Sequence, residues 1–304
     1  MSLNFLFATP EFRGLLAAVE KGEKGIRIQG VTDAARPYVL ACLASKLPKR
    51  LVCVRPPSWP LAPLEEDCRF FLSRLRSTIP AGSLPALSDD PYLGIPPSLD
   101  AVSSRMKFLW SALNWSSSLT VTNPFGLLKP LPAPADLERS FLSIEVGRAM
   151  DRDDLLRTLS EYGYSREDLI ASPGEYAWRG GIIDVFPPWQ AYPFRIELGG
   201  DAVVSLREFD TGTQRSLRKV DRALLPSLRE FPGSPEFLAS WVPLARKAGS
   251  EARKDLEDKV RFLEQGDHFP SFVYLSLLAK DRCVPVSNSL RETTASPPSS
   301  IRNG

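Results

Sequence analysis

The hydrophobic positions of the first part of the chain alternate between helical spacing and short apolar runs. Apolar residues three and four positions apart predict helices in four segments: residues 11–22, 35–47, 64–77 and 98–115. Short apolar runs between them predict three strands: residues 25–31, 50–54 and 118–124. Strands that alternate with helices predict a parallel, helix-covered α/β sheet up to about residue 135.

The middle of the chain follows another pattern, in which apolar and polar residues alternate along residues 173–217. Two pairs of alternating runs are each joined by a glycine-containing turn: residues 176–179 with 182–186, and residues 194–198 with 203–209. Such pairs are typical of β-hairpins. Residues 151–163 precede them with helical spacing and acidic residues in the first turn. We therefore predict a small antiparallel sheet packed by this helix.

Composition and charge exclude several classes of function. The net charge of +2 over 304 residues gives no overall attraction to nucleic acid. The chain has one histidine, His268, and four widely spaced cysteines without a CxxC pair: Cys42, Cys53, Cys68 and Cys283. This predicts buried free thiols rather than a metal site or disulfides. No signal peptide and no apolar run near the ~20 residues of a spanning helix is visible, so we expect a cytoplasmic protein without membrane contact.

One segment lies where a nucleotide-binding loop would be expected, between the predicted strand 25–31 and the next helix. A phosphate-binding loop of the GxxxxGK[ST] type needs two glycines, a lysine and a hydroxyl that reaches Mg²⁺. Here Gly30 is followed by Ala35, Arg36 and Pro37 at the second glycine, lysine and hydroxyl positions. Because Pro37 lacks both the hydroxyl and a backbone donor, we predict an ordinary connection that binds no cofactor.

A second candidate site is the predicted antiparallel sheet itself. Side chains alternate across a strand, so Arg179, Arg195 and Arg207 share one face if the apolar residues line the core. The simpler interpretation is the solvated face of a half-buried sheet. The functional interpretation is a docking surface with solvent-facing arginines, because the planar guanidinium suits carboxylates of a protein partner.

The segment "GEYAWRGGIIDVFPPWQAYPFRIELGGDAVVSLREFDTGTQRSL" resembles the transcription-repair coupling factors (Mfd), in the N-terminal region that is similar to the repair protein UvrB. The preceding "DRDDLLRTLSEYGYSR" and the earlier "LPALSDDPYLGIPPSLDAVSSRMKFLWSAL" are similar to the same family, and "GVTDAARPYVLACLA" resembles its decayed nucleotide loop. The resemblance covers nearly all of residues 1–290. The ending "FD..TQRSL" is typical of the coupling factors, since UvrB shares only part of this motif.

The resemblance implies a fold of α/β class, in which a degenerate RecA-like (P-loop-like) parallel-sheet domain receives an inserted small α+β domain with an antiparallel sheet. The implied domains are domain 1a at residues 1–138, domain 2 at residues 139–228 and domain 1b, incomplete, at residues 229–290. Residues 291–304, rich in Ser, Thr and Pro, are expected to form a disordered tail.

The resemblance also implies a role. In the family, domain 2 contacts UvrA, the damage-recognition ATPase of excision repair, and Arg179 and Arg195 match its contact arginines. Arg207 is a weaker candidate, and Gly199 replaces an aromatic contact residue of the family.

The resemblance further implies that members of the family continue far beyond residue 304. There an ATP- and Mg-dependent DNA translocase displaces stalled RNA polymerase, while this part is a non-catalytic docking module. Two alternatives stay open: a UvrB-like DNA-binding NTPase subunit, and a purely structural domain of a longer protein.

Overall fold

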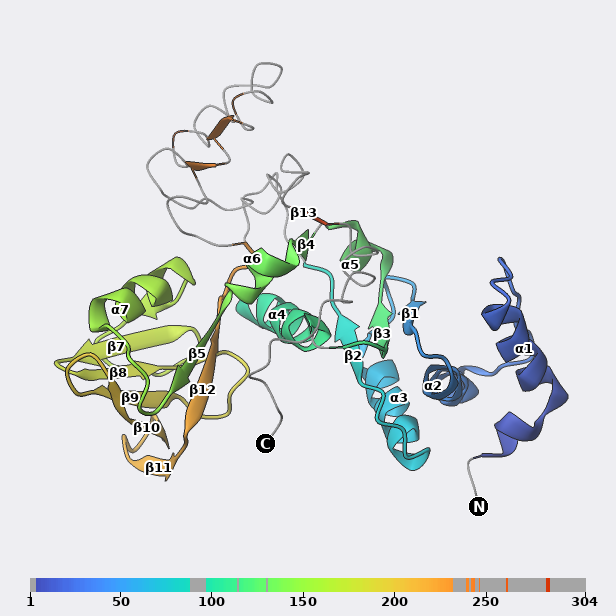
Figure 1. Cartoon of the computed structure of the whole chain (residues 1–304), viewed down its shortest axis with the longest axis horizontal. Helices are drawn as coiled ribbons and strands as arrows, with labels where there is room; N and C mark the ends of the chain where they lie inside the picture. Colours follow the sequence, from blue (N-terminus) through green and yellow to red (C-terminus); the bar gives the residue numbers. More distant parts are fainter. Residues whose placement is uncertain are drawn as a thin grey trace. The chain divides into compact units, whose positions relative to one another are not determined.

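The computed structural model describes residues 4–87, 97–113, 115–129 and 131–231, with a few isolated positions beyond them. It divides into two compact units: Met1–Ala86 with Ser111–Lys129 and Val286–Gly304, and Leu87–Trp110 with Pro130–Pro285. The chain is a mixed α/β protein with parallel and antiparallel sheets, as expected (Figure 1). His268 and nearly all of the predicted segments 229–290 and 291–304 lie outside the described residues, and the predicted domain boundaries stay a prediction.

The first unit contains a parallel three-stranded sheet in the order β1-β3-β2. Its strands are β1 (Arg50–Val54), β2 (Ala81–Leu84) and β3 (Ser118–Thr122), and its helices are α1 (Pro10–Glu20), α2 (Arg36–Lys46), α3 (Ala62–Arg74) and α5 (Pro124–Leu128), with 3-10 turns η1 (Phe5–Ala8) and η2 (Asp33–Ala35). Small residues of α2, Ala41 and Ala44, pack with Cys68 of α3 and Leu119 of β3. The parallel, helix-covered sheet is therefore confirmed.

The predicted strand at residues 25–31 is wrong. Ile26 and Ile28 are exposed by 38% and 50% and lie in irregular chain. Gly25 and Gly30 have φ values of +74° and +78°, so the backbone turns at both ends of the short run, and no strand of the described sheets pairs with it. The strand β2 was not predicted, because its sequence Ala-Gly-Ser-Leu has little hydrophobic character.

The second unit is built around a six-stranded sheet in the order β11-β10-β9-β8-β7-β6. The strands are β6 (Ser165–Arg166), β7 (Glu175–Arg179), β8 (Ile182–Val185), β9 (Phe194–Leu198), β10 (Val203–Phe209) and β11 (Ser216–Lys219). Neighbouring strands are antiparallel except β6 and β7. Both predicted hairpins are confirmed, as β7–β8 and β9–β10.

The helix α7 (Arg152–Glu161) covers the apolar face of this sheet (Figure 1). Leu155 and Leu159 are at most 1% exposed and pack in one cluster with Ile183, Ile196 and Leu206 of the strands. Asp151 begins the helix by accepting a hydrogen bond from the backbone N–H of Asp154 at 2.9 Å. The predicted helix and its packing on the sheet are confirmed. The opposite face carries polar side chains together with a smaller buried apolar cluster that includes Ala177 and Phe209.

The remaining elements of the second unit were only partly predicted. They are α4 (Leu99–Leu113), which continues into the first unit, α6 (Pro134–Glu138), the antiparallel pair β5 (Phe141–Glu145) with β12 (Arg222–Pro226), and the pair β4 (Leu131–Pro132) with β13 (Cys283–Val284). Arg105 of α4 forms an ion pair with Glu230, and both side chains are at most 1% exposed. This pair connects α4 to the chain that follows β12.

Candidate functional site

The face of the six-stranded sheet opposite α7 presents the predicted arginines. The strand register places Asp184 opposite Ala177 on one side and opposite Arg195 on the other, and Arg195 lies opposite Arg207. Arg179 is two residues from Ala177 on the same strand. The expectation that Arg179, Arg195 and Arg207 share one face is therefore confirmed.

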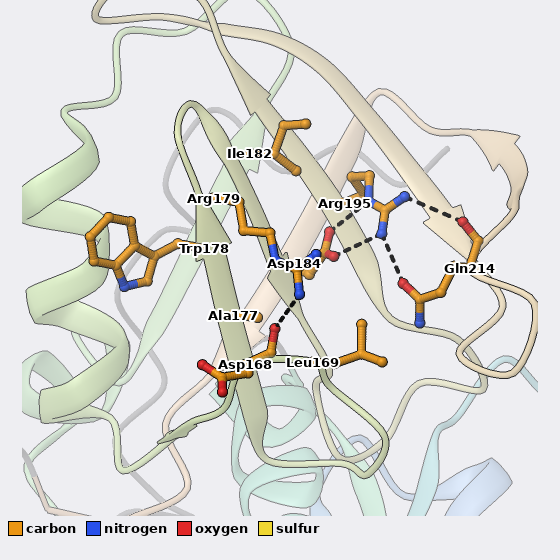
Figure 2. A pocket seen from close by; sticks show the side chains of 9 residues that line it. All are labelled: Asp168, Leu169, Ala177, Trp178, Arg179, Ile182, Asp184, Arg195 and Gln214. Atoms are coloured by element: carbon orange, nitrogen blue, oxygen red, sulfur yellow. Dashed lines mark hydrogen bonds and ion pairs between the residues drawn. The ribbon is translucent and has the colours of Figure 1, made fainter.

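Arg195 does not face solvent freely, which corrects the expectation of an exposed side chain. Its Nε and Nη2 atoms donate to Oδ1 and Oδ2 of Asp184 at 2.7 and 2.8 Å, a bidentate, side-on pairing of guanidinium and carboxylate (Figure 2). The Arg195 side chain is 21% exposed and that of Asp184 is 13% exposed. The reason is the register, since a carboxylate stands directly across the strand pair from the arginine. Hydrogen bonding to Asp184 raises the pKa of Arg195.

The turn between β10 and β11 closes over the same guanidinium. Gln214 has a left-handed φ of +58°, and its side-chain and backbone oxygens accept from Arg195 at 3.2 and 3.4 Å. The carboxylate of Asp210 holds this turn by accepting from the backbone and hydroxyl of Thr213, which lowers the pKa of Asp210. The ring of Phe209 lies 4.3 Å below the guanidinium carbon. Arg195 is thus fixed by its own sheet.

Arg207 is also only partly exposed. Its Nε donates to the hydroxyl of Ser205 at 3.0 Å, and its Nη2 lies 3.7 Å from a carboxylate oxygen of Glu197. Side-chain exposure is 34% for Arg207 and 30% for Glu197. Acidic residues on the same face therefore neutralise two of the three arginines, which the arginine count alone did not indicate.

Arg179 behaves differently, because it is the exposed arginine of the three. Its Nη2 donates to the backbone carbonyl of Asp168 at 2.9 Å (Figure 2). Among the described residues its guanidinium makes this one hydrogen bond, so its other N–H groups remain available to a partner. Of the predicted contact residues, Arg179 best fits the expected solvent-facing cation.

Arg179 and Arg195 both line one pocket of about 220 Å³ on this face. Figure 2 shows Asp184 at its centre, with the side chains of Ile182 and Leu169 on opposite sides of it. The lining residues are Asp168, Leu169, Ala177, Trp178, Arg179, Ile182, Asp184, Arg195 and Gln214. The Trp178 ring points away from this group, and the guanidiniums of Arg152 and Arg166 lie over it at 5.5 and 4.9 Å.

Gly199, the position of the family's aromatic residue, lies in the turn between β9 and β10. A Cβ atom added there would lie 2.6 Å from Cγ1 of Val204, so a larger residue requires Val204 to move. Val204 is itself 56% exposed. The apolar surface at this turn therefore comes from Val204, and the role of Gly199 in binding stays a prediction.

The candidate nucleotide loop forms a short 3-10 turn, η2, that leads into α2. Arg36 pairs with Asp33 at 2.9 Å, and its guanidinium lies 5.7 Å from the ring centre of Trp59. Pro37 is buried in the first turn of the helix, and its carbonyl accepts a weak hydrogen bond from the thiol of Cys68 at 3.8 Å. Since residues 25–31 form no strand, the loop lacks the strand–turn–helix context of a phosphate-binding loop. Gly30 precedes this turn, and Ala35 is its last residue.

Among the described residues, no group of three His, Cys, Asp or Glu side chains is arranged to hold a metal ion. Cys42, Cys53 and Cys68 are free thiols, and Cys42 and Cys68 are fully buried, as predicted. Burial raises the pKa of Cys42 to about 11 and that of Cys68 to about 12. Within the part of the chain described here, no helix has the length and apolarity needed to cross a membrane.

Sequence reasoning missed several residues of the pocket. Asp184 carried a signal, because alternation along "IIDVF" places it outward with Ile182. Its position opposite Arg195 comes from the pairing of β8 with β9, which the loop of residues 186–193 joins. Leu169 and Gln214 lie in irregular chain, where neither periodicity nor spacing indicates the direction of a side chain. They could be assigned only from the structure.

Comparison with known proteins places these observations in a family context. Residues 142–231 match the UvrB interaction domain family. The chain is 31% identical over 208 residues to the transcription-repair-coupling factor of Myxococcus xanthus, covering 67% of this chain and 17% of that protein. It is 26% identical over 235 residues to the factor of Bacillus subtilis, covering 77% of this chain and 20% of that protein.

UvrB proteins match as well. The UvrABC system protein B of Kosmotoga olearia is 23% identical over 266 residues, covering 84% of this chain and 38% of that protein. The chain thus spans 17 to 38% of the length of these three relatives. These matches confirm the resemblance inferred from the sequence: residues 142–231 match the UvrB interaction domain family, and the chain is similar over most of its length to transcription-repair-coupling factors.

Proposed function

We propose that this chain is a non-catalytic docking module that binds UvrA through the polar face of the six-stranded sheet. The observation that supports this best is the exposed guanidinium of Arg179 beside the 220 Å³ pocket, within the match to the UvrB interaction domain. Arginine is enriched among the residues that dominate protein interfaces, and its planar fork suits carboxylates. The named relatives act in transcription-coupled repair and in the UvrABC system, which is the setting in which a UvrA contact belongs.

The three arginines have different tasks in this proposal. Arg179 contacts the partner directly, because it is exposed and has unused N–H groups. Arg195 and Arg207 shape the surface, since they are held by Asp184 and Glu197. The alternative of a purely structural role thus applies in part to Arg195 and Arg207, because these paired arginines also stabilise the sheet.

We further propose that the first unit is a RecA-like domain whose nucleotide loop has lost its function. Its parallel sheet and the engagement of Arg36 by Asp33 support this. In a complete coupling factor, ATP with Mg²⁺, DNA and RNA polymerase would be bound by other parts of the protein. A titration of this chain with Mg-ATP tests the loop, and saturable binding would instead favour the UvrB-like NTPase.

The docking proposal is tested by measuring the Kd between this chain and UvrA from the same organism. Arg179→Glu should weaken binding at least about tenfold, the effect of losing a residue worth roughly 1.4 kcal/mol or more. Arg13→Glu is the matched control, because Arg13 is also exposed, donates one hydrogen bond to a backbone carbonyl, that of Ala8 at 2.9 Å, and belongs to α1 of the first unit. Unchanged binding by Arg179→Glu, with circular dichroism like that of the wild type, would refute UvrA docking at this face.

A further inference from the structure

The pocket beside Arg179 has a centre whose charges are already paired. Asp184 and Arg195 satisfy each other through two hydrogen bonds, and Gln214 takes up a further donor of Arg195. A carboxylate entering from a partner would meet the negative charge of Asp184 and a guanidinium with little capacity left. The pocket therefore does not suit a lone acidic side chain, although Arg179 at its edge does.

The sides of the pocket carry exposed apolar side chains. Leu169 is 51% exposed and Ile182 is 40% exposed, and they lie on opposite sides of Asp184 (Figure 2). Ala177 contributes a small side chain at the base, which leaves space between them. Large apolar side chains that remain this exposed around a concavity are typical of places where a partner buries its own apolar groups.

We propose that this pocket receives one aromatic side chain of UvrA, inserted between Leu169 and Ile182, while an acidic residue next to it pairs with Arg179. This rests on the proposed docking function and identifies the chemistry of its contact. An aromatic ring offers a large apolar surface at small entropic cost, and such residues inserted in pockets dominate many interfaces. The acidic residue of the partner is inferred from Arg179, because this exposed cation at the edge of the pocket has unused hydrogen-bond donors.

The pairing of Asp184 with Arg195 helps to determine which side chains the pocket accepts. Because the pair presents a carboxylate and an amide at the centre, a tyrosine hydroxyl can bond there, whereas a second cation beside Arg195 would be repelled. The contact should therefore combine an apolar contribution that is independent of salt with an ionic contribution through Arg179 that weakens as salt increases.

The experiment compares the Kd for UvrA of the whole chain and of four variants: Leu169→Ala, Ile182→Ala, Val146→Ala and Arg179→Gln. Val146 is a matched control, because it is 42% exposed but lies outside the pocket. Each pocket variant should bind at least about tenfold more weakly than the control, the size expected of a central apolar contact. The salt dependence of binding should stay that of the wild type for both pocket variants and become shallower for Arg179→Gln.

The outcomes separate this inference from the docking proposal. If both pocket variants bind like the Val146 control while Arg179→Glu loses binding, insertion of an aromatic side chain is ruled out and the docking face stands. Weaker binding by Leu169→Ala with an altered salt dependence would also overturn the inference, because it would indicate a disturbed Arg179 rather than a lost apolar contact. Circular dichroism and thermal unfolding of each variant confirm that the fold is intact.

Discussion

The guanidinium of Arg195 makes four hydrogen bonds within its own sheet, two to Asp184 and two to Gln214. Its side chain is mostly buried, so removing either charge leaves the other poorly solvated. A charge reversal at Arg195 is for that reason a poor test of binding, because it would place two carboxylates together. The exposed Arg179 has no such partner and can be reversed without this cost.

The coupling of Asp184 with Arg195 can be measured by a double-mutant cycle. Asp184→Asn and Arg195→Gln should each lower the free energy of unfolding by roughly 1–3 kcal/mol, since each leaves a half-buried charge without its counterpart. The double variant should lose clearly less than the sum of the two. Urea denaturation followed by circular dichroism gives the three values, and strict additivity would contradict the pairing.

The buried thiols predict a pH dependence for the first unit. With folded pKa values of about 11 for Cys42 and about 12 for Cys68, both thiols keep their protons at pH 9 to 10 in the folded state, whereas unfolded thiols lose theirs. The stability that they contribute is complete below the pKa of an unfolded thiol, about 8.5, and decreases as the pH rises toward 11–12. Thermal unfolding between pH 7 and 10.5 should show this loss, and Cys42→Ala with Cys68→Ala should reduce it.

The same thiols should resist alkylation. At pH 8 the folded chain should react with iodoacetamide at Cys42 and Cys68 much more slowly than a denatured chain, because both are buried and protonated. Peptide mass spectrometry resolves the rate at each site. Equal rates in the folded and denatured chains would show that these residues are open to solvent.

At the scale of elements, α7 and the two hairpins of the second unit support the docking face. The helix packs Leu155 and Leu159 against one side of the sheet, and the other side carries the polar residues and a smaller apolar cluster with Phe209. The turn at Gly181 must stay small, because an added Cβ would lie 2.8 Å from the carbonyl oxygen of Leu198. The positions of Arg179 and Ile182 on either side of this turn depend on that close approach.

The start of α7 gives a direct test of its contribution. Asp151→Ala should lower the free energy of unfolding by about 1 kcal/mol, because the backbone N–H of Asp154 loses its acceptor. Asp151→Asn, which keeps an oxygen acceptor, should cost much less. Chemical denaturation distinguishes the two variants, and equal losses would mean that charge rather than the capping hydrogen bond matters.

The elements show which features the sequence predicts well. Alternation and glycine turns predicted both hairpins and the face of each arginine, because these depend on neighbours along the chain. The predictions failed where contacts between residues far apart in the sequence determine whether a segment forms a strand. The run at residues 25–31 has strand-like alternation but forms no strand, and β2 has little pattern yet pairs with β3. The pairing of Arg195 with Asp184 also needed the register between β8 and β9 across the loop of residues 186–193, and the pocket needed Leu169 from an irregular segment.

At the scale of the whole molecule, the main core of the second unit is formed from a continuous part of the chain. Among the residues that the structure describes, the cluster that contains Ile144, Leu159, Ile196 and Leu225 draws none from before residue 142 or after residue 228. Such a segment has its own hydrophobic core, which is the physical requirement for folding alone. The predicted domain 139–228 is therefore a suitable fragment for binding experiments.

The isolated fragment 139–228 should fold and unfold in one cooperative transition. It omits both members of the buried pair Arg105–Glu230, so neither charge is left alone in it. A fragment extended to residue 231 keeps Glu230 without Arg105 and should gain no stability from the extension. Thermal unfolding monitored by circular dichroism compares them, and a fragment 139–228 without a cooperative transition would contradict an independent core.

The strand register that places Asp184 across from Arg195 has a consequence for how such proteins diverge. A single substitution at either position leaves the other, mostly buried charge without its partner. The single variant is therefore less stable, and it must persist before a compensating substitution can arise. Over evolutionary time the two positions should accordingly be replaced jointly or hardly at all, whereas position 179 is free to drift with the surface of the molecule it meets. In relatives that bind a different partner, position 179 should therefore be substituted before positions 184 and 195.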